Sequence, residues 1–194
     1  ESVGNLRQLL VSTQAGKSNV IAELERLGLR IEKSDPRLAR LLEAVKDKEA
    51  QGYAYEGADA SFFLLAQSVL GRVPDYFTVA RFQVSVERRY NSSGDLVTFS
   101  EATVKIIVDG QELISAAEGD GPVNALDRAL RKDLGRYQCH IAQLRLSDFR
   151  VRIFEGGTDA VTRVLIESTD ETGESWTTVG VSANIIDASF QALT

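Results

Sequence analysis

Residues 102–134 read ATVKIIVDGQELISAAEGDGPVNALDRALRKDL, and this stretch decides the fold. Its opening alternates apolar and polar side chains with the period of a strand that has one buried face, at Ala102, Val104, Ile106 and Val108. Asp109-Gly110 is typical of a two-residue hairpin turn, so a second strand is expected over Leu113–Ala117. Gly119-Asp120-Gly121-Pro122 then predicts a helix start, because proline is favoured at the first helical position. The apolar stripe of this helix is Val123, Leu126, Leu130 and Leu134.

A third strand precedes this hairpin. Its apolar residues change phase part-way along, which indicates a long strand with a bulge: Phe77 and Val79, then Phe82, Val84 and Val86. The polar run Asn91-Ser92-Ser93-Gly94 predicts the loop that follows it. The predicted order is therefore strand, strand, strand, helix.

The same order recurs towards the C-terminus. Strands are expected around Phe149–Ile153, Val161–Glu167 and Trp176–Val181, with turns at Glu155–Thr158 and Asp170–Gly173 and a helix from about Ser182. Asn124 and Asp127 match Asn184 and Asp187 at an offset of 60 residues, as Val104 matches Val164. The sequence thus predicts two βββα units, at about 72–137 and 143–194. One helix barely covers the apolar face of a three-stranded sheet, so we expect a partner to bury the remainder.

The first 71 residues are expected to be mainly helical. A short strand at Leu6–Ser12 and a polar turn at Gly16–Asn19 precede a helical stripe of Ile21, Leu24 and Leu27, which ends at Gly28. Asp35-Pro36 predicts the next helix start, and another helix is expected from about Ala58 to Leu70. The predicted fold class is α+β, with a mainly helical subdomain (1–71) followed by a domain of the two βββα units (72–194).

The composition limits the classes of function. The net charge of −6 and the pI near 5.0 argue against a nucleic-acid partner, which would require a positive surface. The sequence has no apolar run long enough to cross a membrane and no secretory signal, and its one cysteine suits a reducing compartment, so a cytoplasmic location is expected. The chain lacks methionine and opens with Glu1, and we interpret it as part of a longer protein.

No pattern in the chain is typical of a catalytic or metal site. Cys139 and His140 are adjacent, so their side chains diverge and cannot act as nucleophile and base; a loop after Leu134 is the simpler interpretation. One histidine and one cysteine cannot supply a transition-metal site without a carboxylate cluster, and none is evident. The Gly119–Val123 loop could instead bind an anion at a helix start, with Gly121 allowing close approach or a positive φ. A tight strand-to-helix turn explains the same glycines without a ligand.

Several long motifs resemble one enzyme family. Glu118–Leu126 (EGDGPVNAL) is similar to the signature loop of the C-terminal regulatory (allosteric and dimerisation) domain of the 2-isopropylmalate synthase and citramalate synthase family. Three further segments resemble the citramalate synthase branch of the family: Arg163–Ser168, Trp176–Ser182 and Asn184–Ser189. Gly52–Ser61 and Val11–Asn19 resemble the linker region of that branch.

The resemblance implies a function that the composition does not. These transferases condense acetyl-CoA with a 2-oxo acid on a divalent-metal barrel, which would precede this region and is absent from it. The regulatory region would form a homodimer and bind isoleucine or leucine as a feedback effector, and it would carry no cofactor or catalytic residue itself. The effector site implied is Gly119, Asp120, Gly121, Pro122 and Val123, with Phe149, Ile153 and Ala160 on the following strands. Asp120 replaces the usual asparagine of this loop, and its carboxylate would repel a ligand carboxylate but attract an ammonium group.

Four alternatives remain at the level of sequence. The region could belong to a 2-isopropylmalate synthase with leucine as effector, or be a stand-alone amino-acid-sensing module. A double-stranded-RNA-binding fold also combines strands and helices, but the acidic balance argues against it. An independent hydrolase is disfavoured because no nucleophile and base are paired.

Overall fold

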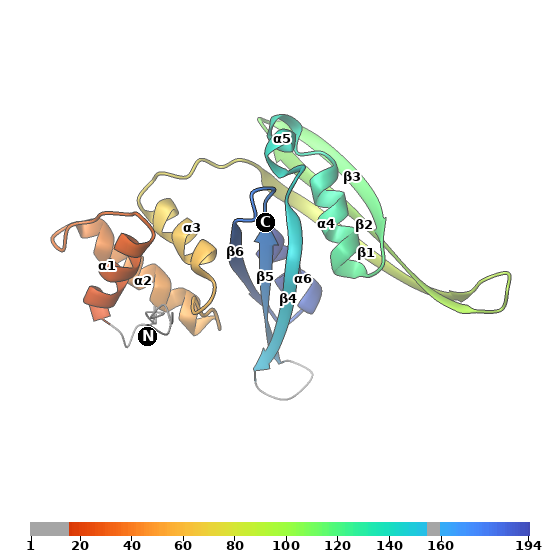
Figure 1. The fold of residues 1–194 in the computed structure, drawn as a ribbon, viewed down its shortest axis with the longest axis horizontal. Helices are drawn as coiled ribbons and strands as arrows, with labels where there is room; N and C mark the ends of the chain where they lie inside the picture. Colours follow the sequence, from red (N-terminus) through yellow and green to blue (C-terminus); the bar gives the residue numbers. More distant parts are fainter. Residues whose placement is uncertain (1–15, 155–159) are drawn as a thin grey trace, which may run out of the picture.

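The computed structural model describes residues 16–154 and 160–194. Two three-stranded antiparallel sheets, each followed by a helix, stand beside three N-terminal helices, which confirms the α+β class (Figure 1). The strand expected at Leu6–Ser12 and the turn at Glu155–Thr158 lie outside the described residues. None of the described helices is both long and apolar enough to span a membrane.

The first βββα unit is built as its sequence predicts. Strands β1 (Thr78–Tyr90), β2 (Leu96–Val108) and β3 (Gln111–Gly119) pair in that order, and α4 (Pro122–Lys132) covers one face. The register shifts between Val79 and Arg81, which confirms the predicted bulge. Asp109 and Gly110 both have positive φ, 50° and 79°, as a two-residue hairpin with the right twist requires.

The second unit repeats this order but not the predicted spacing. It comprises β4 (Arg145–Phe154), β5 (Val161–Thr169), β6 (Ser175–Ser182) and α6 (Ile185–Leu193). The two helices begin 63 residues apart, so the offset of 60 is wrong for the helix starts; the helix expected from about Ser182 is present and begins at Ile185, after its N-cap Asn184. The hairpins differ in length, because Val108 pairs with Gln111 whereas Thr169 pairs with Ser175. A matching Asn-x-x-Asp therefore occupies different helical positions in the two units.

The helices α4 and α6 form a shared layer between the two sheets (Figure 1). Phe190 of α6 joins the core of the first unit, where its ring lies 4.3 Å from that of Phe82 on β1. On its own sheet, α6 lies so close to β6 that a side chain at Gly180 would overlap the Ala188 carbonyl oxygen. One helix thus packs against both sheets and holds the two units together.

Helix α3 (Asp59–Val69) packs on the other face of the second sheet at β6, and α1 (Gly16–Arg26) and α2 (Pro36–Ala50) pack behind it (Figure 1). Their core includes Leu24, Leu41 and Phe62 together with Val179 and Val181 of β6. The polar turn expected at Gly16–Asn19 is wrong, since α1 begins at Gly16. The burial of Val20 and Ile21 against the neighbouring helices favours extending the helix through this polar turn.

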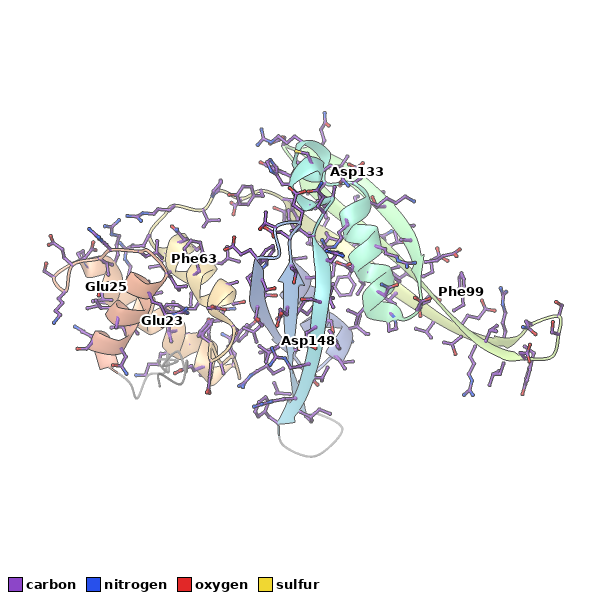
Figure 2. The ribbon with its side chains drawn as sticks, in the orientation of Figure 1. Glu23, Glu25, Phe63, Phe99, Asp133 and Asp148 are labelled. Carbon is purple, nitrogen blue, oxygen red and sulfur yellow. The ribbon has the colours of Figure 1, made fainter. Side chains whose placement is uncertain are left out.

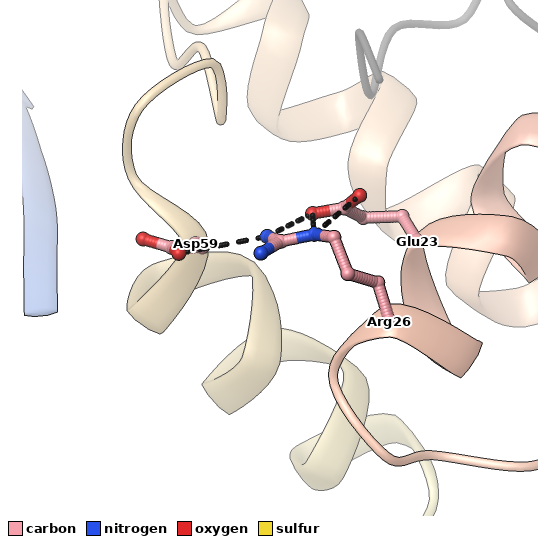
Figure 3. A network of polar contacts seen from close by, with 3 residues as sticks. All are labelled: Glu23, Arg26 and Asp59. Carbon is pink, nitrogen blue, oxygen red and sulfur yellow. Dashed lines mark hydrogen bonds and ion pairs between the residues drawn. The ribbon is translucent and has the colours of Figure 1, made fainter. Parts of the chain in front are cut away.

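Capping ends and starts these helices where the sequence predicts, and an ion-pair network that the sequence did not predict joins two of them. Gly28 ends the α1 segment with φ 76°, and the Asp35 side chain accepts a hydrogen bond of 2.8 Å from the Arg37 amide at the start of α2. Arg26 joins α1 to α3, because its Nε lies 3.0 Å from both carboxylate oxygens of Glu23 and its Nη2 lies 3.5 Å from Asp59 Oδ2 (Figure 3). Glu23 is buried, so this pairing offsets the cost of desolvating its charge.

The segment between the units is helical, and the loop expected around Cys139 and His140 is wrong. A 3₁₀ turn, η2 (Gly135–Tyr137), leads into the one-turn helix α5 (Gln138–Ile141). The Gln138 side chain holds this turn against the end of α4. It accepts a hydrogen bond from the Leu134 amide and donates one to the Arg131 carbonyl, at 3.0 and 2.7 Å. These local bonds give a short segment enough support to form helical turns.

Candidate functional site

The start of α4 leaves backbone donors without a side-chain cap. Gly121 is the N-cap residue in extended conformation (φ −165°, ψ 169°), and it has no side chain with which to accept a hydrogen bond. The nearby amide of Asn124 does not fill the gap, because its Oδ1 accepts from the Asp120 amide at 3.3 Å. The first turn of a helix carries partial positive charge, so this end favours an anion.

Gly119 and Gly121 of the loop differ in why glycine occupies the position. A Cβ at Gly119 would lie 2.5 Å from the Ala125 amide nitrogen, so only glycine lets the end of β3 approach the helix this closely. A Cβ at Gly121 would meet nothing within 4 Å, and its φ is not positive. The positive φ considered for Gly121 is therefore wrong, and glycine at this position leaves the helix start open.

Ser100 is a polar residue at this site that the sequence reasoning missed. It pairs with Gly119 across the sheet, it is fully buried, and its Oγ has no hydrogen-bond partner in the described part of the chain. A buried hydroxyl without a partner is costly, so a ligand or water is expected to complete it. The signal was present in the sequence, because Ser100 precedes Ala102 and Val104 on the core-facing period of β2.

The other predicted residues lie on or beside the strands of the second unit. Phe149 and Ile153 pair with Ile166 and Thr162, so they share the face of the sheet on which α6 packs. They occupy the outer strand β4, where 36% and 68% of their surfaces are exposed. Ala160 stands just before β5 and is half-buried. Their face is directed towards the α4–α6 layer, but no described hydrogen bond or ion pair joins them to the Gly119–Val123 loop.

A broad hollow lies beside this loop and not in it. It follows the open edge of β3, where Lys132 and Arg128 of α4 donate to the strand carbonyls of Ala116 and Glu118 at 3.0 and 3.2 Å. These two side chains supply hydrogen-bond donors to backbone carbonyls at the edge of the sheet that have no neighbouring strand. Across residues 16–154 and 160–194, no three His, Cys, Asp or Glu side chains come together as metal ligands. Cys139 is exposed, and its thiol lies 3.9 Å from the Arg136 carbonyl oxygen.

The family model for the LeuA allosteric (dimerisation) domain matches residues 56–194. The chain belongs to this family. The matched range holds both βββα units and every residue of the predicted site.

Curated relatives carry the resemblance over the whole chain. An (R)-citramalate synthase of Synechocystis is 45% identical over 98% of this chain, and one of Geobacter sulfurreducens is 44% identical over all of it. A probable 2-isopropylmalate synthase of Methanosarcina mazei is 31% identical over the full chain. The chain spans 35%, 36% and 35% of these three relatives, or about a third of their length. The resemblance to a citramalate and 2-isopropylmalate synthase regulatory domain, expected from the sequence motifs, is confirmed.

Proposed function

We propose that this chain is the allosteric and dimerisation region of an acetyl-CoA-dependent citramalate synthase and takes no part in catalysis itself. Residues 1–71 would form the linker to a catalytic barrel, and 72–194 would form the regulatory domain. The high identity to (R)-citramalate synthases supports this assignment over a 2-isopropylmalate synthase. Acetyl-CoA, a divalent metal and pyruvate would bind to the barrel, which lies outside this chain.

The effector that fits the open start of α4 is a branched-chain amino acid. The observation that carries this proposal is the uncapped helix start at Gly121, together with Ser100, which pairs with Gly119 and whose hydroxyl has no partner within the described residues. The amides of the first turn would bind the ligand carboxylate, and the Asp120 carboxylate would bind its ammonium group. Val123 and the apolar face of β4 would receive the aliphatic side chain. Isoleucine is favoured over leucine because the relatives with the higher identity are citramalate synthases.

Calorimetric titration of the chain with isoleucine and with leucine tests this effector site. Gly121→Ala is a clean probe, because its methyl group meets no atom of the chain yet projects where the ligand backbone would approach. We expect it to weaken isoleucine binding about tenfold or more while leaving the melting temperature within a degree or two.

Ser93→Ala, in the exposed loop between β1 and β2, is the matched control and should bind as the wild type does. Unchanged affinity in a folded Gly121→Ala variant would place the effector elsewhere. Tighter binding of leucine than of isoleucine would favour the 2-isopropylmalate synthase alternative.

The second half of the proposal is that the chain forms a homodimer. Phe149, Val151 and Ile153 form an exposed apolar row on β4, with Ile153 68% exposed. A second apolar group, Val86, Tyr90 and Leu96, lies on the β1–β2 hairpin arm, which projects beyond α4 with Phe99 along it (Figures 1 and 2). Exposed apolar rows of this kind are typical of surfaces that a partner buries.

Analytical ultracentrifugation tests the dimer with a matched pair of variants. Ile153→Asp places a charge in the β4 row and should shift the chain from a dimer towards a 21.2 kDa monomer at micromolar concentration. Ile114→Asp adds the same charge at an equally exposed residue, 64%, on the face of the first sheet opposite α4, and should leave the dimer intact. A monomeric wild-type chain, or equal effects of the two variants, would contradict this interface.

A further inference from the structure

Three arginines share one face of the second sheet, opposite the face on which α6 packs. Arg152 of β4 and Arg163 of β5 are direct cross-strand partners, and Arg150 lies two residues before Arg152 on the same face. Like charges directly opposite each other destabilise a sheet. This row therefore costs stability unless something compensates the charge.

Arg163 is held in place by groups that carry no negative charge. Its Nε donates to the Gly52 carbonyl at 2.8 Å, its Nη2 donates to the same oxygen, and its guanidinium lies 4.1 Å from the Phe154 ring. Burial and then the Arg152 charge lower the pKa of Arg163. These contacts fix the direction of the guanidinium but leave its charge uncompensated, because a carbonyl and a ring supply only partial negative charge.

The nearby carboxylates neutralise only part of the row. Asp148, also on β4 (Figure 2), pairs with Arg150 at 3.0 Å. Glu56 lines the same hollow, but no ion pair joins it to an arginine within the described residues. In the described ranges, Arg152 likewise has neither a salt bridge nor a hydrogen bond from its side chain. Among the residues that the structure describes, two of the three guanidinium groups thus have no anionic partner.

The arginines form one wall of a cleft. The other wall is Ala54, Glu56 and Gly57, from the segment that joins α2 to α3, and Leu165 completes the lining. The cleft has a volume of about 290 Å³. This is at the lower end of the range for ligand sites, which admits a phosphate or a short dicarboxylate but not a nucleotide cofactor.

We propose that this cleft binds a small dianion, with Arg152 and Arg163 as its charged ligands and the residue 54–57 segment as its opposite wall. Planar guanidinium groups bind carboxylate and phosphate oxygens in pairs, which matches the cross-strand placement of the two side chains. The bound anion would join the N-terminal helices to the second βββα unit. This site is separate from the start of α4 and does not depend on the effector proposal.

Titration with inorganic phosphate and with malate, each at constant total ionic strength set with chloride, tests the site. Saturable binding of phosphate alone assigns a phosphate-bearing ligand, and saturable binding of malate assigns a dicarboxylate. Arg152→Gln should weaken the binding of the preferred anion about tenfold or more. Arg88→Gln, which removes the same charge from the exposed β1 arm, should leave the affinity unchanged.

Melting curves separate a ligand site from a structural role. Without the anion, Arg152→Gln should melt at the same temperature as the wild type or higher, because it relieves the repulsion with Arg163. With saturating anion it should melt lower than the wild type. A lower melting temperature in both conditions would assign Arg152 a structural role and overturn the proposal. Absence of saturable binding of either probe, or equal effects of the Arg152 and Arg88 variants, would also overturn it.

Discussion

The two βββα units share an architecture but treat the start of their helices differently. In the second unit, Asn184 caps α6, since its Oδ1 accepts from the Ile186 amide at 2.8 Å and from the Asp187 amide at 3.4 Å. In the first unit, Gly121 leaves α4 without a side-chain cap. The corresponding asparagine of that unit, Asn124, lies about one helical turn after the N-cap position and does not cap the helix. A capped start stabilises a helix, whereas an open start keeps its donors available to a ligand.

The units also differ in what covers them. In the second sheet, β5 and β6 are packed on both faces, by α6 and by the N-terminal helices, and side chains protect the edge strand β6, whereas the edge strand β4 is largely exposed. Ser61 of α3 accepts a hydrogen bond from the Val179 amide at 2.9 Å, and Gln191 of α6 accepts one from the Val181 amide at 3.2 Å. The first sheet has only the α4–α6 layer, and its hairpin arm projects away (Figure 1). Among the described residues, β5 and β6 of the second sheet are therefore more enclosed than the first sheet, whose hairpin arm is exposed.

The largest effect is expected from removing the ring that joins the units. Phe190→Ala deletes a side chain that is 4% exposed and packs on Phe82, so it should lower the free energy of unfolding by about 4 kcal/mol. Ile185→Ala, at a 44% exposed position of the same helix, should cost less than about 1 kcal/mol. Denaturant unfolding followed through Trp176 of β6 and by circular dichroism measures both. Similar losses for the two variants would show that α6 does not couple the units.

A smaller effect is expected from exchanging the helix starts. Asn184→Ala removes the cap of α6 and should cost about 1 kcal/mol. Gly121→Asn adds an acceptor to α4, whose extended N-cap conformation admits it, and should gain a few tenths of a kcal/mol. If the open start binds the effector, the added cap should also weaken isoleucine binding. Stabilisation without any loss of isoleucine affinity would separate the helix start from the effector site.

The smallest effect concerns α2, whose start is capped by a carboxylate. Hydrogen bonds from the Arg37 side chain and amide lower the pKa of Asp35 to about 2 from its ordinary 3.8. The stabilisation is present above the ordinary pKa and is lost as the pH falls through the folded value. Asp35→Asn keeps an acceptor for the cap but has no carboxylate to titrate. Melting temperatures from about pH 5 to pH 2 should converge for the two proteins; a constant difference would contradict this account.

Much of the fold followed from local signals in the sequence. The alternation from Ala102 to Val108 and the Asp109-Gly110 turn predicted a hairpin that the structure confirms, because strand period and turn chemistry are local properties. The offset of 60 failed because hairpin length is set by loop conformation, which changes the helix position without changing the motif. The polar turn at Gly16–Asn19 failed because burial of the adjacent residues outweighed the low helix propensity of Gly16, Ser18 and Asn19.

The sequence by itself determined the order of the elements, the family resemblance and the loop at the start of α4. Only the tertiary structure distinguished Gly119, which the packing of β3 against α4 requires, from Gly121, which has open space around it. It alone brought Ser100 beneath that loop and placed Arg152 opposite Arg163 across two strands. The physical reason is that periodicity and capping act over a few residues. Burial, unmet hydrogen bonds and like-charge contacts depend on which distant segments meet.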